Sequence, residues 1–270
     1  MATRTVALRT AAAGVPVRRA QPVGDALTIT WRNLLTIRRT PRLLVFATIQ
    51  PVMFVLMFRY VFGGAIRVPG VSYVNYLMPG IFVQTVVFGS LTTGIGLSED
   101  LHKGLIDRFR SLPMARSAVL VGRSLADLGR NVFVVGLMAV VGFIVGWKPD
   151  HGWLGLPAAL LLVIAFSYAL SWVFAIVGLS APDAETAQAM SFPLLAPLVF
   201  ASSAFVPVKS MPDWLQGFAS HQPVSVVVNA ARDLTLGKPV GGDFWQAVAW
   251  IAGIVAVCAP IAVARYRRVG

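Results

Sequence analysis

Six stretches of the sequence are long and apolar enough to cross a lipid bilayer, and this feature constrains the fold more than any other. A spanning helix needs about 20 mainly apolar residues, and helices satisfy their own backbone groups where no water is present. The expected spans are roughly 43–62, 77–98, 131–147, 154–179, 187–206 and 246–264. Only 13% of the residues are charged, against about 25% in a typical soluble domain. The sequence therefore predicts an all-α integral membrane protein with one transmembrane domain over 41–268.

The positions of the basic residues orient these spans. Of the 23 Lys and Arg residues, 17 fall within 1–42, 99–130 and 265–268. Six spans place both termini and the 99–130 loop on one side, and cytoplasmic segments carry an excess of Lys and Arg. We therefore expect both termini, including a basic tail over 1–24, in the cytoplasm. Because the net charge of +12 is split among separate segments, it does not indicate nucleic-acid binding.

Residues 25–40 are predicted to form an amphipathic helix at the membrane surface. Leu27, Trp31, Leu34 and Leu35 share one helical face, and basic residues such as Arg38 and Arg39 follow nearby. Such a helix buries its apolar face in the inner leaflet and directs its cations toward anionic lipid. A soluble tail is the alternative interpretation.

A dense island of charge, EDLHKGLIDRFRSLPMARS over 99–117, separates the second and third predicted spans. Read as a helix over 99–112, it places Leu101, Leu105 and Phe109 on one face, although Gly104 costs about 1 kcal/mol inside a helix. An apolar stripe flanked by both signs of charge predicts a docking surface for another protein. A solvated loop is the alternative.

Beyond this island, a polar stripe of Arg123, Asp127 and Arg130 predicts that the third helix starts in the cytoplasm and enters the bilayer near Asn131. Asp127 is expected to pair with Arg123 or Arg130, which lowers the cost of placing charges at the interface. Small residues spaced four apart, Ser90 with Gly94 and Gly142 with Gly146, favour close helix contacts.

Residues 211–236 follow the fifth span on the external side. Two short helices are predicted here, with a break at the His221-Gln222-Pro223 tripeptide, and Trp214 and Phe218 lie in the first helix. Non-helical backbone at membrane depth is tolerated only against protein or a cavity. We therefore expect a re-entrant helical hairpin packed over the outer ends of the spans; a plain surface loop is the alternative.

The motifs of several enzyme classes are missing from the sequence. No Walker A, HExxH or GxSxG pattern occurs, and His102, His151 and His221 fall in separate loops. The single cysteine, Cys258, excludes a cysteine metal cluster. We therefore expect no catalytic residue, metal or cofactor in this chain. A docking surface without an energy source instead predicts a soluble motor subunit below the membrane domain.

Two segments carry a family resemblance. EDLHKGLIDRFRSLPMARSAVLVGR resembles the segment after the second span of bacterial type-2 ABC exporter permeases of the daunorubicin/doxorubicin-resistance subfamily. SSAFVPVKSMPDWLQGFASHQPVSVVVNAARDL resembles that subfamily's external segment. The resemblance implies a permease in the bacterial cytoplasmic membrane. It would work with a second permease, the same or a homologous chain, and with two ATPase subunits that hold ATP and Mg.

The resemblance also implies roles for named residues. Residues 25–40 would be the connecting helix. The coupling helix would contact the ATPase through Glu99, Asp100, Leu101, Lys103, Gly104, Leu105, Asp107, Arg108, Phe109 and Arg110. The external gate helices would contain Trp214, Phe218, His221, Gln222, Pro223, Asn229 and Arg232.

The spans suggest an apolar cargo, because ionisable residues are nearly absent away from their ends. A wall of flexible and aromatic side chains suits a hydrophobic or amphipathic drug, antibiotic or lipid; its expected members are Met53, Phe54, Met57, Phe82, Phe88, Phe192 and Phe200. Contact with membrane lipid or neighbouring helices explains the same residues. A non-transporting assembly scaffold and an intramembrane enzyme are the alternative functions.

Overall fold

The computed structural model describes residues 24, 27–31, 35, 41–64, 66, 68, 70–104, 116–149 and 154–268, and within these ranges the regular structure is entirely helical. The elements in chain order are α2 (Pro41–Leu56), the π-helix η1 (Met57–Phe62), α3 (Tyr73–His102), α5 (Arg116–Ile144), α6 (Gly155–Gly178), α7 (Ala184–Phe200), the 3₁₀ helix η2 (Val208–Ser210), α8 (Asp213–His221), α9 (Pro223–Thr235) and α10 (Gly242–Arg268). The predicted all-α class is therefore confirmed for this part of the chain.

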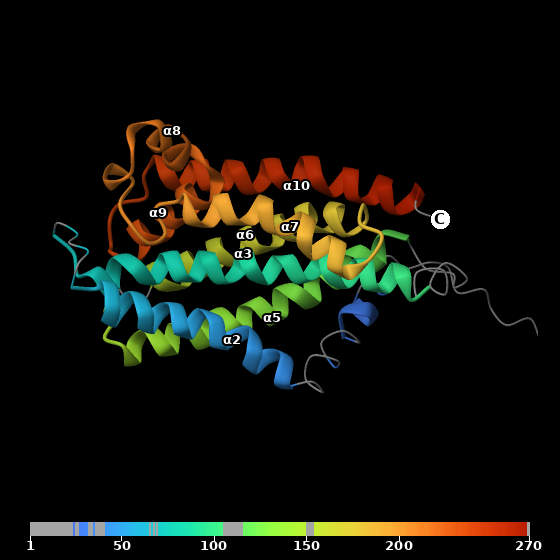
Figure 1. The fold of residues 1–270 in the computed structure, drawn as a ribbon, viewed down its shortest axis with the longest axis horizontal. Coiled ribbons are helices and arrows are strands. Elements are labelled where there is room, and N and C mark those ends of the chain that lie inside the picture. Colours follow the sequence, from blue (N-terminus) through green and yellow to red (C-terminus); the bar gives the residue numbers. More distant parts are fainter. Residues whose placement is uncertain are drawn as a thin grey trace, which may run out of the picture.

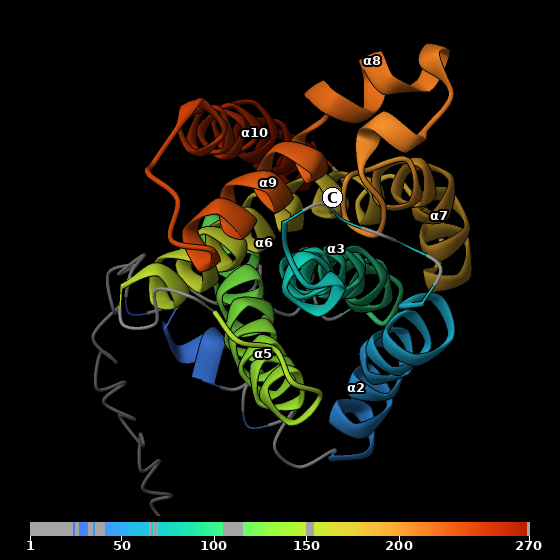
Figure 2. The same cartoon turned by 90° about the vertical axis from the view of Figure 1, so that its left-hand side faces the viewer.

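The helix α3 lies at the centre of the bundle. Viewed along the bundle, it is surrounded by α2, α5, α6, α7 and α9 (Figure 2). Every residue from Tyr73 to Val87 is buried, as expected for a helix that is apolar on all sides. By contrast, only 11% of the most apolar 18-residue stretch of α10 is buried. The peripheral helices thus present their outer faces to the surroundings, while the Tyr73–Val87 part of α3 is enclosed by protein.

Four helices are long and apolar enough to cross a membrane: Tyr73–His102, Leu120–Ile144, Gly155–Gly178 and Gly242–Arg268. They correspond to the second, third, fourth and sixth predicted spans. The first predicted span corresponds to α2 and η1, within which Thr48–Phe62 is a shorter apolar helix.

The fifth predicted span, 187–206, is longer than the helix observed there. The helix α7 ends at Phe200, and residues 201–206 form turns. These turns are stabilised by side chains: Ser202 Oγ donates to Val199 O at 2.6 Å, and Gln222 Nε2 donates to Ala201 O at 3.0 Å. Polar side chains thus replace the helical hydrogen bonds, which hydropathy alone does not predict.

The two ends of the bundle differ in chemistry (Figure 1). One end, here named the charged end, carries the last turn of α3, the short helix at 27–31 and the basic end of α10 with Arg265, Arg267 and Arg268. The opposite end, the capped end, is covered by α8 and α9 (Figure 1). The helix at 27–31 and the end of α10 therefore share one end of the molecule.

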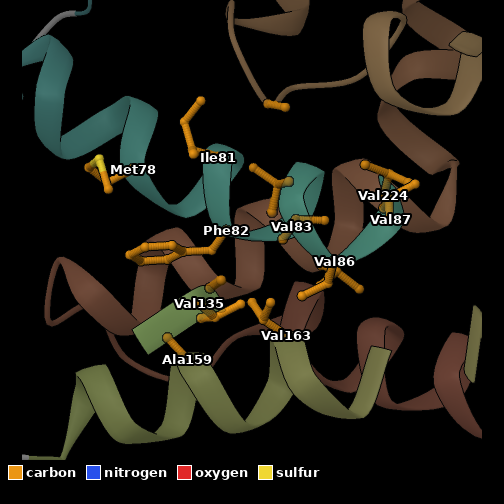
Figure 3. Packing of buried hydrophobic residues seen from close by; sticks show 14 of the residues in the cluster. Met78, Ile81, Phe82, Val83, Val86, Val87, Val135, Ala159, Val163 and Val224 are labelled. Carbon is orange, nitrogen blue, oxygen red and sulfur yellow. The ribbon is translucent and has the colours of Figure 1, made fainter. Parts of the chain in front are cut away.

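Close approaches between backbones hold α3 in place. A Cβ on Gly94 would lie 2.5 Å from Phe174 O, and one on Gly178 would lie 2.2 Å from Gly94 O. Ser90 Oγ also donates to Ser167 O at 3.2 Å, so the pattern at 90 and 94 does mark a close contact, with α6. Apolar side chains of α3 fill the rest of the interface, for example Phe82 beside Val135 of α5 (Figure 3).

The second small-residue pattern has a different role. Gly146 lies beyond the end of α5 with φ +94°, and Trp147 N donates to Gly142 O at 2.8 Å. This arrangement is a helix terminus closed by a left-handed glycine. The expected close contact is therefore present at Gly142, where a Cβ would lie 2.6 Å from Met78 Cε of α3, but not at Gly146.

We predict that Gly94→Leu destabilises the bundle, because the added side chain meets the backbone of α6. Overpacking of this kind costs about 1–3 kcal/mol or more. The matched control is Gly253→Leu in α10, where a Cβ meets nothing within 4 Å. Size-exclusion profiles and thermal midpoints in detergent measure the effect; equal behaviour of the two variants would contradict the packing described.

Candidate functional site

An ion pair joins α3 to α5 at the charged end. The Arg123 guanidinium on α5 contacts the Asp100 carboxylate on α3, with 21% and 23% of the side chains exposed. One turn away, Lys103 Nζ lies 3.0 Å from Glu99 Oε2, and both groups are exposed. Leu101 packs below them against a small apolar cluster. The end of α3 thus combines acidic and basic side chains with an apolar contact through Leu101.

The helix predicted over 99–112 is interrupted at Gly104, which takes φ +65°. Gly104 N donates to Leu101 O at 3.0 Å, so the last turn of α3 closes there, as a glycine in the left-handed region allows. The stripe of the predicted helix therefore does not run through Gly104. Leu105, Asp107, Arg108, Phe109 and Arg110 lie outside the described residues.

The helix at 27–31 packs against the charged end through one face. Ile29 is only 4% exposed, and Thr30 Oγ1 donates to Gly122 O at 3.1 Å. Leu27 and Trp31, two members of the predicted apolar face, remain 58% and 64% exposed. The contact through Ile29 was not predicted. Arg38 and Arg39 lie outside the described residues.

A second polar network lies deeper, between α3 and α5. The Asp127 and Arg130 side chains are 13% and 14% exposed, and Arg130 Nη1 lies 3.8 Å from Asp127 Oδ1. Thr93 Oγ1 donates to Asp127 Oδ2 at 2.6 Å, and Arg130 Nη2 donates to Gly89 O at 2.5 Å. Of the two partners expected for Asp127, Arg130 is the observed one, because Arg123 pairs with Asp100.

Asn131 extends this network to α6. Its Nδ2 donates to Ser167 Oγ at 2.6 Å, and its Oδ1 accepts from Arg130 Nη2 at 3.4 Å. A line of polar contacts therefore connects three helices through the apolar part of the bundle. Such buried polar residues are rare within membrane segments and commonly have a functional role.

At the capped end, Arg232 binds three elements together. Its side chain is almost fully buried; Nε donates to Tyr76 O at 3.0 Å, Nη2 to Ser203 O at 2.8 Å and Nη1 to Asn229 Oδ1 at 3.0 Å. The guanidinium carbon also lies 3.6 Å from the centre of the Tyr76 ring. Burial lowers the pKa of Arg232, but an arginine pKa is so high that the side chain stays charged. Arg232 thus fastens α9 to α3 and to the turn after α7.

The predicted break between two short helices at 221–223 is confirmed. Gln222 lies between α8 and α9, and its Nε2 donates to Leu198 O at 2.9 Å near the end of α7. Pro223 begins α9, where no backbone donor is needed. His221 is exposed, and its Nδ1 lies 2.9 Å from Gly217 O within α8.

The two helices of the cap differ in burial. In α8, Trp214 and Phe218 are 80% and 46% exposed, so this helix lies on the surface. Most of α9 is buried against α3, α6 and α10. A cavity of about 430 Å³ lies beside α9, and its lining includes Tyr76, Asn229, Arg232, Lys209 and Lys238. The predicted gate residues therefore divide between an exposed helix and a buried polar site.

The structure does not bring the expected cargo wall together as one surface. Met53 of α2, Met57 of η1, and Phe192 and Phe200 of α7 are exposed. Phe82 is fully buried 5.3 Å from the Trp147 ring, so it belongs to the core and not to a wall. Phe88 lines a separate cavity next to Arg130.

Among the ring contacts of the described residues, two of the expected wall residues share a neighbour. The Phe54 and Phe200 rings both stack on Phe205, at centroid distances of 5.9 and 6.2 Å. This aromatic contact joins α2 to the segment after α7. Apart from Phe205, the partners that sequence reasoning missed are mainly hydroxyl groups and backbone oxygens, such as those of Tyr76, Ser203 and Thr93. The available signal was Arg232, because an arginine inside the mainly apolar run of 224–234 needs hydrogen-bond acceptors from the rest of the chain.

The sites described above consist of contacts between helices. Within the described ranges, no group of three or more His, Cys, Asp or Glu residues is placed to hold a metal ion. The polar groups form ion pairs and hydrogen bonds between helices, and cavities lie beside them. Residues 25–236 match the ABC-2 type transporter family.

The chain belongs to this family. It is the permease subunit of an ABC transporter, and the ATPase activity resides in a separate subunit.

Named relatives cover most of the chain. One relative is the daunorubicin resistance ABC transporter permease protein DrrB1 of Streptomyces coeruleorubidus, to which the chain is 37% identical. The aligned region covers 94% of this chain and 90% of the relative. Another is the probable doxorubicin resistance ABC transporter permease protein DrrC of Mycobacterium tuberculosis, to which the chain is 30% identical. Here the aligned region covers 82% of this chain and 80% of the relative. A putative transport permease, ycf38 of Cyanophora paradoxa, is 25% identical over 75% of this chain and 71% of its own length.

We predict that Arg232→Met loosens the cap, because two buried carbonyl oxygens lose a charged donor. Hydrogen bonds to charged groups contribute about 1.5–3 kcal/mol each, so the thermal midpoint in detergent should fall by several degrees. Hydrogen exchange should increase in α9. Lys209→Met, which changes an exposed cation on the same cavity, is the control. Unchanged exchange in α9 of the Arg232 variant would rule out the clamp.

Proposed function

We propose that the chain is the permease of a bacterial exporter that moves hydrophobic or amphipathic molecules out across the cytoplasmic membrane. The observation that carries this proposal is the 37% identity, over 94% of the chain, to a permease named for daunorubicin resistance. The exposed apolar faces of α2 and α7 and the scarcity of charge within the bundle are consistent with an apolar cargo. Two ATPase subunits, with their own ATP and Mg, would drive transport.

The proposed topology has six spans with both termini in the cytoplasm. Here α2 with η1, and α7, are the first and fifth spans. As a 17-residue helix, α7 is about 26 Å long, somewhat short for a hydrocarbon core of about 30 Å. Residues 201–206 would complete the crossing, since backbone groups of Ala201, Ser203, Ala204 and Phe205 form hydrogen bonds with side chains of the protein. The charged end then faces the cytoplasm, in keeping with its arginines, and α8 and α9 form the re-entrant external cap.

The proposed ATPase contact is the charged end of α3 together with the following residues to 112. Glu99, Asp100 and Lys103 lie at the surface where α3 ends, and the Arg123–Asp100 pair transmits displacement of this end to α5. The connecting helix, through Ile29 and Thr30, lies against the same end. Movement of the docked ATPase subunits would therefore act on α3 and α5 together.

A second permease, the same or a homologous chain, is proposed to cover the exposed faces of α2 and α7. Met53, Phe192 and Phe200 project from these faces, and Met57 projects from the adjoining η1. Membrane lipid would cover what the partner leaves. Hydrophobic cargo would pass along this apolar surface.

We predict that Leu105→Ala and Phe109→Ala each reduce export by about tenfold while the permease stays in the membrane, because truncation of an interface anchor commonly costs 1–2 kcal/mol or more. The measurement is efflux of a fluorescent amphiphile from cells that express the permease with its ATPase. Affinity purification in gentle detergent measures ATPase association in parallel. Leu161→Ala, which truncates an exposed apolar side chain of α6 outside every proposed contact, is the control. Unchanged export and ATPase association in both variants would overturn the coupling role, and a chain that never co-purifies an ATPase would favour a scaffold.

A further inference from the structure

A cavity of about 240 Å³ lies where α2, α3 and α5 meet, beside the Asp127–Arg130 pair. Its lining has an apolar part and a hydrogen-bonding part: Pro51, Phe88, Leu91 and Val134 in the first, and Gln50, Thr85, Thr92, Arg130 and Asn131 in the second. Sites for drug-sized ligands usually measure about 300–1,000 Å³. This cavity is therefore suited to one head group and the first part of an apolar chain.

Arg130 has donors to offer to such a ligand. Its hydrogen bonds to Gly89 O and Asn131 Oδ1 both start from Nη2. Nη1 lies 3.8 Å from Asp127 Oδ1, which is beyond hydrogen-bond distance. Because a guanidinium carries five N–H donors, Nη1 and Nε retain donors for an oxygen ligand.

The charge of the cavity favours an anion. The Asp127 carboxylate does not line it and instead accepts a hydrogen bond from Thr93 at 2.6 Å. Among the described residues of the lining, Arg130 is charged and no carboxylate is present. A cation beside amide and hydroxyl groups recognises phosphate or carboxylate oxygens through charge-assisted hydrogen bonds.

The depth of Arg130 argues for a ligand that comes from the membrane. Arg130 follows Arg123, the partner of Asp100 at the charged end, by seven residues, or about 10 Å along the helix. In the proposed topology this depth lies within the inner leaflet. An intramembrane arginine is costly, and it marks a ligand path or a paired site more often than a packing contact.

We infer that this cavity binds the phosphate or carboxylate head of an anionic amphipathic molecule from the inner leaflet, with Arg130 as its cationic contact. The inference depends on the proposed function for its placement in the membrane, and it assigns a ligand class to that function. Bilayer lipid and exported cargo are the two sources of this chemistry.

The test uses a photoactivatable fatty acid and its methyl ester as probes, with the permease in phosphatidylcholine nanodiscs without ATPase. We expect the acid to label peptides of α2, α3 and α5 about tenfold more than the ester does. Arg130→Gln combined with Asp127→Asn removes both charges of the pair, and it should abolish this preference while the protein remains monodisperse. Leu91→Trp, which fills the cavity without changing charge, should lower labelling by the acid. Arg59→Gln is the control, since Arg59 does not line the cavity.

Equal labelling by acid and ester, or a preference for the acid that survives the double substitution, would overturn the inference. Competition by phosphatidylglycerol assigns the site to bilayer lipid; competition by an exported amphiphile alone assigns it to cargo. If the double variant does not fold, Leu91→Trp decides the result. Because binding is measured without transport, a negative result leaves the exporter proposal standing, and loss of export with intact binding would affect that proposal alone.

Discussion

The rest of the structure depends on the close contact of α3 with the helices around it. Between membrane helices the hydrophobic effect gives little attraction, so association depends on packing and on interhelical hydrogen bonds. Gly94 and Gly178 allow α3 and α6 to meet backbone to backbone, and a Cβ on Gly80 would lie 2.1 Å from Ala204 O. These approaches bring polar groups of α3 within reach of α5, α6 and the capped end.

All three polar contacts that matter for the proposed function involve α3. At the capped end, Tyr76 O accepts a hydrogen bond from Arg232. Near the middle of the helix, Gly89 and Thr93 contact the Asp127–Arg130 pair. At the charged end, Asp100 pairs with Arg123. From Tyr76 to Asp100 the helix is about 36 Å long. We propose that α3 moves as one body, so that displacement at the charged end reaches the capped end.

Much of this arrangement could be predicted from the sequence, because hydropathy reports directly on helices that need the bilayer. Four candidate spans, the break at Gln222 and an ion pair of Asp127 with a neighbouring arginine follow from local patterns, whereas the choice of Arg130 over Arg123 does not. The end of α7 at Phe200 and the interruption at Gly104 were not predicted. The first depends on side chains distant in sequence, and the second on a backbone angle that a helical pattern does not reveal. Phe82 shows the same limit, since its burial depends on which helices surround α3.

The most direct test of this account is the accessibility of the cap during the ATPase cycle. Lys209→Cys, in a Cys258→Ser background, places a thiol at the 430 Å³ cavity beside Arg232. The rate of its reaction with a water-soluble maleimide would be measured in the assembled complex, with and without a non-hydrolysable ATP analogue. If movement at the charged end reaches the cap, the analogue changes this rate several-fold, and Phe109→Ala removes the change. A rate that is the same with and without nucleotide, in a complex that binds it, would contradict coupling through α3.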